Sequence, residues 1–112
     1  MAAPLSRAAV VAAAREMIAT KGLDAVSLRG LSATLGVTAP ALYAYVTDKH
    51  DLLRAVAAHE FSRLLEVFDA IDDPDPLVRV ASYSRAYIDY AVANPSLFRT
   101  MFLFPPELVL PE

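Results

Sequence analysis

The chain has 112 residues, enough for one small domain and part of a second. It contains no cysteine, which excludes disulfides and thiolate metal sites, and its net charge of −3 gives no overall sign of a nucleic-acid partner. It is 56% hydrophobic with three glycines, and its many alanines and leucines favour helix. No apolar run is long enough for a membrane span or a signal peptide, so we expect a cytoplasmic protein.

The charge is unevenly distributed along the chain. Residues 1–55 carry six basic and four acidic side chains, a net charge of +2, whereas residues 56–112 carry four basic and nine acidic ones, a net charge of −5. This asymmetry favours a first half that faces nucleic acid and an acidic second half with another task.

The first two predicted helices are bounded by serine and glycine residues. Ser6 can cap a helix that ends at Gly22, where a left-handed glycine would close it, and Ser27 can cap a short helix that ends at Gly36. Apolar residues that recur every three to four positions here and in the next helix are expected to form the core: Val10, Val11, Ala14, Met17, Ile18, Leu28, Leu31, Leu35, Leu42 and Val46.

Two further helices are expected before residue 71. Thr38 can cap a third, short helix with Pro40 in its first turn, where proline is tolerated. Asp48 begins a long fourth helix that runs to about Ala70. Residues 27–46 thus combine two short helices with a glycine-containing turn, which is the pattern of a helix-turn-helix.

The second half continues with helices. Residues 72–76 form a loop rich in aspartate and proline, a fifth helix follows from about Leu77 to Ala93, and a sixth begins at residues 94–96 and ends before Pro105. No strand-like alternation of useful length occurs. We therefore expect an all-α chain with a three-helix DNA-binding domain in residues 1–50, and a linker helix with a partial helical domain in residues 51–112.

The helix-turn-helix pattern predicts how DNA would be bound. The second helix of the motif enters the major groove with its first residues nearest the bases, and residues 38–41, Thr-Ala-Pro-Ala, are small enough to approach base edges and thymine methyl groups closely. Exposed amides at the starts of the second, third and fourth helices favour phosphates. Lys49 opposes the dipole of the fourth helix, and a phosphate beside it would remove that conflict.

The run GLDAVSLRGLSATLGVTAPALYAYVTDKHDLL, preceded by AAAREMIATK, resembles the N-terminal domain of the TetR family of bacterial repressors. The form P-x-L-Y-x-x-V-x-x-K is closer to the tetracycline-repressor branch than to the version with phenylalanine before the lysine. Two residues depart from the family pattern without removing a contact: Gly30, which weakens its helix by about 1 kcal/mol relative to alanine, and Ser32. The matched residues are Gly22, Ser27, Gly36, Val37, Thr38, Leu42, Tyr43, Val46, Lys49, Leu52 and Leu53.

The resemblance implies a role for eight residues in DNA binding. Ser27, Thr38, Tyr43 and Lys49 fall on positions that contact phosphates, and Arg29, Ala39, Pro40 and Tyr45 fall on positions that contact bases or lie beside them. Plainer alternatives exist for three of them. Tyr43 can pack under the third helix, Tyr45 can be exposed or pack on the fourth, and Arg29 can be a solvated surface arginine.

The segment YIDYAVANPSLFRTMF resembles the start of the family's C-terminal regulatory domain, which implies a small-molecule effector pocket. Tyr83, Tyr87 and Phe102 are candidate ligand contacts among aromatic residues that also include Tyr90 and Phe98, although an aromatic stripe at helical spacing is more often core. The family's later helices, which complete the pocket and the dimer interface, are not in this sequence. The apolar tail FLFPPELVLPE would also need a covering layer, so we expect a partial regulator.

Other chemistry finds little support. His59-Glu60 lacks the second histidine of a zinc-protease motif, because Arg63 stands at that position, and the aspartates of residues 72–75 lack the glycine of a calcium loop. We therefore expect no metal, no cofactor and no enzyme activity.

The sequence predicts a ligand-responsive repressor that binds a pseudo-palindromic operator as a homodimer. The alternatives are a helical interaction module that has lost DNA binding and an enzyme built in the second half.

Overall fold

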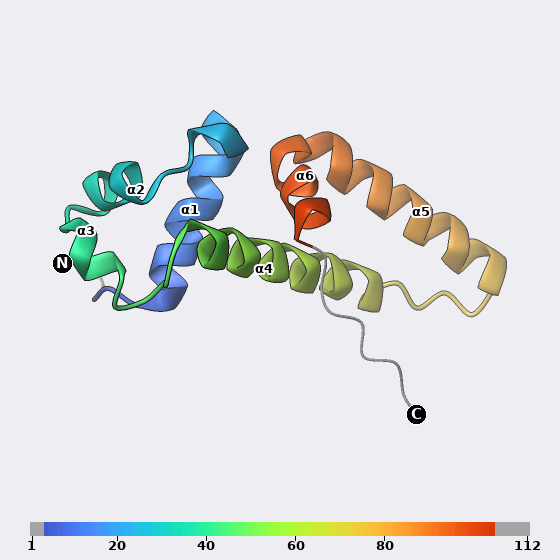
Figure 1. Cartoon of the computed structure of the whole chain (residues 1–112). Coiled ribbons are helices and arrows are strands. Elements are labelled where there is room, and N and C mark those ends of the chain that lie inside the picture. Colours follow the sequence, from blue (N-terminus) through green and yellow to red (C-terminus); the bar gives the residue numbers. More distant parts are fainter. Residues whose placement is uncertain (1–3, 105–112) are drawn as a thin grey trace, which may run out of the picture.

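The computed structural model describes residues 4–104, and these residues form helices joined by turns and loops, with no strand among them. The expected all-α class is therefore confirmed. The expected helices all occur, and a short 3-10 helix that the sequence did not suggest follows the first of them. The elements are α1 (Arg7–Lys21), η1 (Leu23–Ala25), α2 (Leu28–Leu35), α3 (Ala39–Leu42), α4 (Lys49–Asp69), α5 (Pro76–Ala93) and α6 (Pro95–Leu103) (Figure 1).

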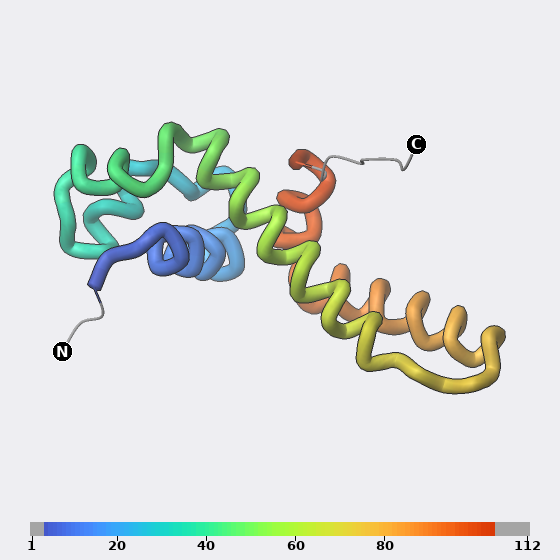
Figure 2. The backbone as a smooth tube through the Cα atoms, turned by 90° about the horizontal axis from the view of Figure 1, so that it is seen from below, coloured from blue at the N-terminus to red at the C-terminus, as the bar shows by residue number. Residues whose placement is uncertain are grey.

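The long helix α4 connects the helices of the first half of the chain to α5 and α6. Helices α1, α2 and α3 gather around its first half, and we call this unit, residues 7–56, the head (Figure 1). Helix α5 runs back along the second half of α4, and α6 then returns to contact both α4 and α1. The result is elongated, with principal extents of 53 × 36 × 29 Å, and the head lies at the end opposite the start of α5 (Figure 2).

Side-chain caps start three of the helices as expected. Ser6 Oγ accepts a hydrogen bond from the Ala9 amide at 3.1 Å, Ser27 Oγ accepts one from the Gly30 amide at 2.9 Å, and Asp48 Oδ1 accepts one from the Asp51 amide at 2.7 Å. Each bond satisfies one of the amides that a helix start leaves without a partner.

The third cap prediction is wrong in its chemistry although right in its position. Thr38 precedes α3, but its side chain makes no cap hydrogen bond. A cap oxygen needs the amide of the second or third helical residue. The second residue is Pro40, which has no N–H, and the third, Ala41, donates its N–H to the Thr38 carbonyl at 3.0 Å.

The two glycines that end helices do so differently. Gly36 closes α2 in the left-handed conformation (φ 70°, ψ 29°), as expected. Gly22 closes α1 at φ 91° and ψ 161°, so the prediction of a left-handed glycine there is wrong. This extended backbone with positive φ is open essentially to glycine alone, and it redirects the chain from α1 into η1.

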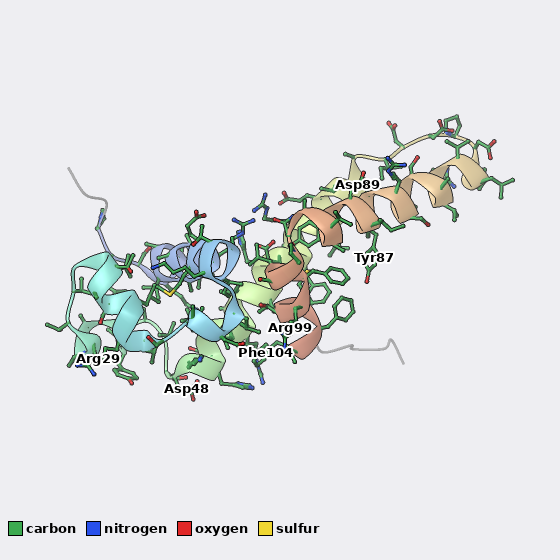
Figure 3. All side chains as sticks on the ribbon, turned by 90° about the horizontal axis from the view of Figure 1, so that it is seen from above. Arg29, Asp48, Tyr87, Asp89, Arg99 and Phe104 are labelled. Carbon is green, nitrogen blue, oxygen red and sulfur yellow. The ribbon has the colours of Figure 1, made fainter. Side chains whose placement is uncertain are left out.

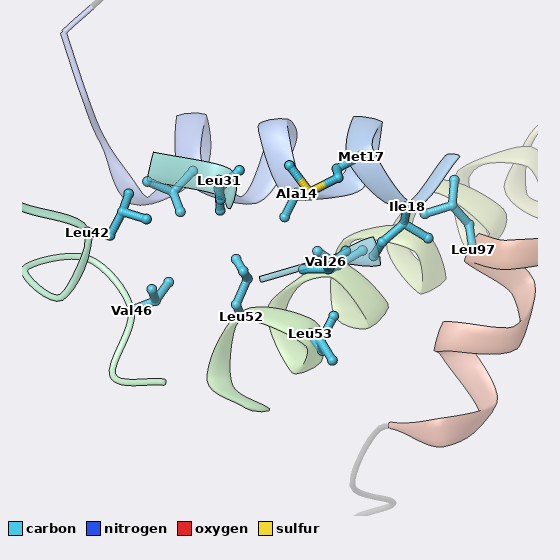
Figure 4. Close-up of a cluster of buried hydrophobic side chains, with 12 residues drawn as sticks. Ala14, Met17, Ile18, Val26, Leu31, Leu42, Val46, Leu52, Leu53 and Leu97 are labelled. Carbon is cyan, nitrogen blue, oxygen red and sulfur yellow. The ribbon is translucent and has the colours of Figure 1, made fainter. Parts of the chain in front are cut away.

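One apolar core holds the head together (Figure 4). The expected residues Val11, Leu28 and Leu35 lie half-buried at its edge. Burying a leucine or isoleucine side chain completely contributes roughly 1.5–3 kcal/mol. Because the core crosses residue 50 and includes Leu97 of α6, the second half of the chain helps to hold the head. The buried members of this core are Val10, Ala14, Met17, Ile18, Val26, Leu31, Leu42, Val46, Leu52, Leu53, Val56 and Leu97.

A buried charged cluster joins the head to the second half. Glu60 of α4 is 0% exposed, and its carboxylate accepts hydrogen bonds from Arg15 Nε of α1 and from the Tyr90 hydroxyl of α5. A buried carboxylate must be paired in this way to be tolerated. Burial, and then the hydrogen bond to Glu60, raise the pKa of Tyr90 far above its usual value of 10.0, so Tyr90 remains a donor.

Helix α5 is the least covered element. None of its residues is buried, and several apolar side chains, such as Leu77, Ile88 and Val92, are more than half exposed. Within residues 4–104, none of the helices combines the length and apolar character that crossing a bilayer requires. Most of the apolar tail predicted to need a covering layer, residues 105–112, lies outside the described residues.

Candidate nucleic-acid interface

The turn between α2 and α3 has the geometry expected of a helix-turn-helix. The Gly36 amide donates to the Ala33 carbonyl at 3.2 Å and the Val37 amide to the Ser32 carbonyl at 3.0 Å, which closes α2 and turns the chain. Leu31 of α2 and Leu42 of α3 are both fully buried in the head core. Their burial fixes the inner faces of the two helices and leaves the opposite faces at the surface.

Three of the four predicted phosphate contacts lie on exposed ends of helices. Ser27 and Thr38 are the residues before α2 and α3, and Lys49 is the first residue of α4; all three are exposed. The fourth, Tyr43, follows α3 directly and is 55% exposed, so it does not pack under that helix. The structure therefore leaves hydroxyls and an ammonium group exposed at the starts of α2, α3 and α4 and just after α3.

The predicted base contacts divide into exposed and half-buried residues. Arg29 is exposed on α2 and points into solvent at the end of the molecule away from α5 (Figure 3), and Pro40 is exposed on α3. Ala39 is half-buried, as is Tyr45, whose ring packs against the head core. The position of Tyr45 thus corresponds to the packing alternative, and a base contact from it remains a prediction.

The buried Ser32 departs from the family pattern without leaving a polar atom unpaired. Its Oγ donates to the Arg29 carbonyl at 2.8 Å. The other departure is Gly30, where a Cβ would lie 2.9 Å from Ser27 Oγ, the oxygen that caps α2, so the Ser27 side chain would have to shift. Glycine therefore leaves room for the cap at the start of the helix that precedes the turn.

The basic residues of the head fall into two groups. Arg7 and Arg15 form ion pairs with Asp51 and Glu60, so their charges are neutralised within the protein. The sequence pattern did not reveal these pairs. The other basic residues of the head are exposed, and no carboxylate of residues 4–104 lies within ion-pair distance of them: Lys21, Arg29, Lys49 and Arg54.

The predicted effector contacts are grouped only in part. Tyr83 and Tyr87 line one shallow, open groove along α5 with Phe68, and Tyr83 meets Phe68 edge to face at 5.5 Å between ring centroids. Phe102 is 55% exposed and lies outside this groove, connected to Tyr87 through the ring of Phe98. Among residues 4–104, no three histidine or acidic side chains gather where they could hold a metal ion.

These features define the class of protein first and its family second. Two short helices, a glycine turn and an exposed front of the second helix make this a helix-turn-helix protein. Residues 10–56 match the family model described as "Bacterial regulatory proteins, tetR family". The head therefore matches the N-terminal helix-turn-helix domain of this family, as the sequence resemblance predicted.

Individual proteins extend the similarity into the second half. The chain is 26% identical over 100 residues to the "Uncharacterized HTH-type transcriptional regulator YobS" of Bacillus subtilis, a match that covers 88% of this chain and 52% of that protein. The solved structure of SCO0253, a TetR-family transcriptional regulator from Streptomyces coelicolor, aligns with a TM-score of 0.78 and 27% identity over 96% of this chain and 62% of that one.

A second structure, of a possible TetR family transcriptional regulator from Streptomyces coelicolor A3(2), aligns with a TM-score of 0.72 and 32% identity. That alignment covers 87% of this chain and 47% of the other. The chain thus spans about half the length of the relatives that it matches. Because the alignments cover nearly all of this chain, the arrangement of α4, α5 and α6 as well as the head is shared with this family.

Proposed function

We propose that this protein is a sequence-specific DNA-binding regulator of transcription, in which the head places α3 in the major groove. The observation that carries this proposal is the set of exposed polar groups at the starts of α2, α3 and α4 and just after α3. Ser27 lies at the start of α2, Thr38 and Tyr43 lie at the two ends of α3, and Lys49 starts α4. Groups in such positions fix a helix-turn-helix on the phosphate backbone.

The chemistry at each position suits a phosphate. Ser27 Oγ accepts a hydrogen bond from the Gly30 amide and can still donate its own proton outward. Thr38 has no cap bond to maintain, so its hydroxyl is available to a ligand. Lys49 stands at the positive end of the dipole of α4, where a bound phosphate would relieve the electrostatic conflict.

Base recognition would rest on few side chains. Arg29 is exposed and can reach guanine or a phosphate, while Ala39 and Pro40 present small apolar surfaces that suit thymine methyl groups. The head carries little net positive charge, and two of its arginines are paired internally. We therefore expect binding to depend on hydroxyls, helix ends and a few exposed cations more than on total charge.

We further propose that the complete regulator is a ligand-responsive repressor that acts in the cytoplasm as a homodimer. Two heads related by two-fold symmetry would bind half-sites about 34–36 Å apart on a pseudo-palindromic operator. The relatives named as transcriptional regulators support regulation of transcription. An effector near Tyr83, Tyr87 and Phe102 would act on the head through α4 and through the buried charged cluster around Glu60.

The contribution of Lys49 tests DNA binding directly. The affinity of the chain for a labelled mixed-sequence duplex is measured by fluorescence anisotropy at about 50 to 200 mM NaCl. Lys49→Ala should weaken binding and reduce the slope of log affinity against log salt by roughly 1, because one phosphate contact is lost. Lys21→Ala is the matched control, since it removes an exposed lysine at the far end of α1.

The outcomes separate the candidate functions. Equal slopes for Lys49→Ala and the wild type would remove the phosphate role of Lys49. If the wild type shows no salt-dependent affinity for any duplex, the helical interaction module becomes the better explanation of the fold. An enzyme in the second half would instead require turnover of a substrate.

A further inference from the structure

Arg7, the first residue of α1, joins three segments of the head. Its Nη1 donates to the Tyr45 carbonyl at 2.7 Å and to Asp51 Oδ2 at 3.0 Å, and its Nη2 donates to Asp51 Oδ1 at 3.1 Å. The two bonds to Asp51 make a bidentate pair, the strongest geometry available to an arginine and a carboxylate. We call Arg7, the Tyr45 carbonyl and Asp51 the Arg7 clamp.

Asp51 connects the Arg7 clamp to the start of α4. Its Oδ2 accepts the Thr47 amide at 2.9 Å, and its own amide donates to Asp48 Oδ1 at 2.7 Å. The hydrogen bond from Arg7, followed by that from Thr47, lowers the pKa of Asp51 to about 2. The carboxylate therefore stays ionised at neutral pH, and the clamp weakens only as the pH falls towards 2.

The segment held by the Arg7 clamp is the one that most needs support. Helix α3 has only four residues, and residues 43–48, a turn followed by a bend, connect it to α4. A helix this short is not stable by itself, because its first turn costs more than its hydrogen bonds return. Leu42 and Val46 bury one side of the segment, whereas Arg7 satisfies the Tyr45 carbonyl at its exposed end.

We propose that Arg7 is a positioning residue for DNA recognition: it fixes the orientation of α3 relative to α1 and α4, and it contacts no phosphate. The inference rests on the DNA-binding function proposed above and concerns how the same interface is held. Both charges of the pair are partly exposed, so even with bidentate geometry the pair contributes only modestly to folding, on the order of 1 kcal/mol. The effect of losing Arg7 should therefore appear in affinity for DNA more than in stability.

Asp51→Asn gives the sharpest test because two explanations predict opposite signs. If only net charge mattered, removing a carboxylate near the interface would strengthen binding to DNA. If the Arg7 clamp positions α3, replacing the carboxylate by an amide leaves one acceptor oxygen to share between Arg7 and Thr47 and breaks the bidentate pair, so binding should weaken. The probe is a duplex selected from a random-sequence pool by the wild-type chain, with an unselected duplex of the same length beside it.

Four variants of the whole chain are compared in this assay. Arg7→Gln and Asp51→Asn should each weaken binding to the selected duplex by roughly 3- to 10-fold, with the salt slope unchanged because no phosphate contact is lost. Arg7→Lys should recover part of the affinity, since lysine can donate to one acceptor but cannot form the bidentate pair. Arg85→Gln, which breaks an exposed arginine–aspartate pair on α5, is the matched control and should leave affinity unchanged.

Two results would overturn the proposal while the wild type still binds DNA. One is a salt slope reduced by about 0.9 in Arg7→Gln, which would make Arg7 a phosphate contact. The other is wild-type or tighter binding by Asp51→Asn.

Amide hydrogen exchange without DNA tests the Arg7 clamp independently. Arg7→Gln should speed exchange at Val46 and Thr47 but not in α5. Unchanged exchange at Val46 and Thr47 would overturn the clamp. If the wild type binds no duplex, the DNA-binding function fails and the positioning role for DNA fails with it. Faster exchange in Arg7→Gln would then show that the clamp supports the head only structurally.

Discussion

Tyr90→Phe removes a single hydroxyl from the buried cluster that joins the head to α5. That hydroxyl donates to Glu60, which is 0% exposed and has Arg15 as its other side-chain partner. A hydrogen bond to a charged group contributes about 1.5–3 kcal/mol. We therefore expect Tyr90→Phe to lower the free energy of unfolding by that amount, which corresponds to a fall in Tm of roughly 6–13 °C for a chain of this size.

Arg15→Met should have a larger effect in the same cluster. It removes the cationic partner of a buried carboxylate, and breaking a buried ion pair from one side costs about 3–5 kcal/mol because the remaining charge is left without compensation. The measurement is urea unfolding followed by circular dichroism. Tyr87→Phe is the control, since Tyr87 lies at the surface of α5, the helix that also carries Tyr90. A Tyr90→Phe variant as stable as Tyr87→Phe would refute the reasoning.

The pH dependence gives the same test a second form. The pKa of Tyr90 is raised in the folded protein, so its stabilising contribution is complete below the unfolded value of 10.0 and is lost as the pH rises towards the folded value. The difference in stability between the wild type and Tyr90→Phe should therefore be constant at neutral pH and shrink above about pH 10. A difference that does not change at high pH would place the origin of the effect elsewhere.

Two substitutions test other parts of the fold. Leu97→Ala should cost about 2–5 kcal/mol in urea unfolding because Leu97 of α6 is fully buried in the head core, and a cost below about 1 kcal/mol would mean that α6 is dispensable to the head. Gly30→Ala should fail to raise Tm despite the better helix propensity of alanine, because its Cβ would displace the Ser27 cap, whose loss costs about 0.5–2 kcal/mol. A gain of about 1 kcal/mol would contradict this account of Gly30.

The helices and most of the core were predictable because their signals are local. Serine and aspartate caps, glycine stops and three-to-four-residue spacing of apolar side chains are properties of short segments. They predicted α1 and α2 closely. Local signals also misled at Thr38, where Pro40 two residues later lacks the N–H that a cap requires. They misled again at Gly22, where φ is positive but ψ, at 161°, lies outside the left-handed helical region.

The pairings that hold the head could not be predicted in the same way. Arg7 and Asp51 are 44 residues apart in the chain, and Arg15 and Glu60 are 45 apart. No local pattern links residues at such separations, because only the packing of α1 on α4 brings them together. The candidate DNA contacts could be named from sequence through the family resemblance, whereas the burial of Tyr45 became apparent only in the structure.

The selection of sequences from a random duplex pool tests the central claim most directly. The whole chain is immobilised, bound duplexes are recovered over several rounds, and the affinity of the enriched sequence is measured against salt. We predict enrichment of a common sequence whose affinity exceeds that for unselected DNA and falls as salt rises. A pool that stays random after selection, with no salt-dependent binding, would contradict the claim that this head recognises DNA.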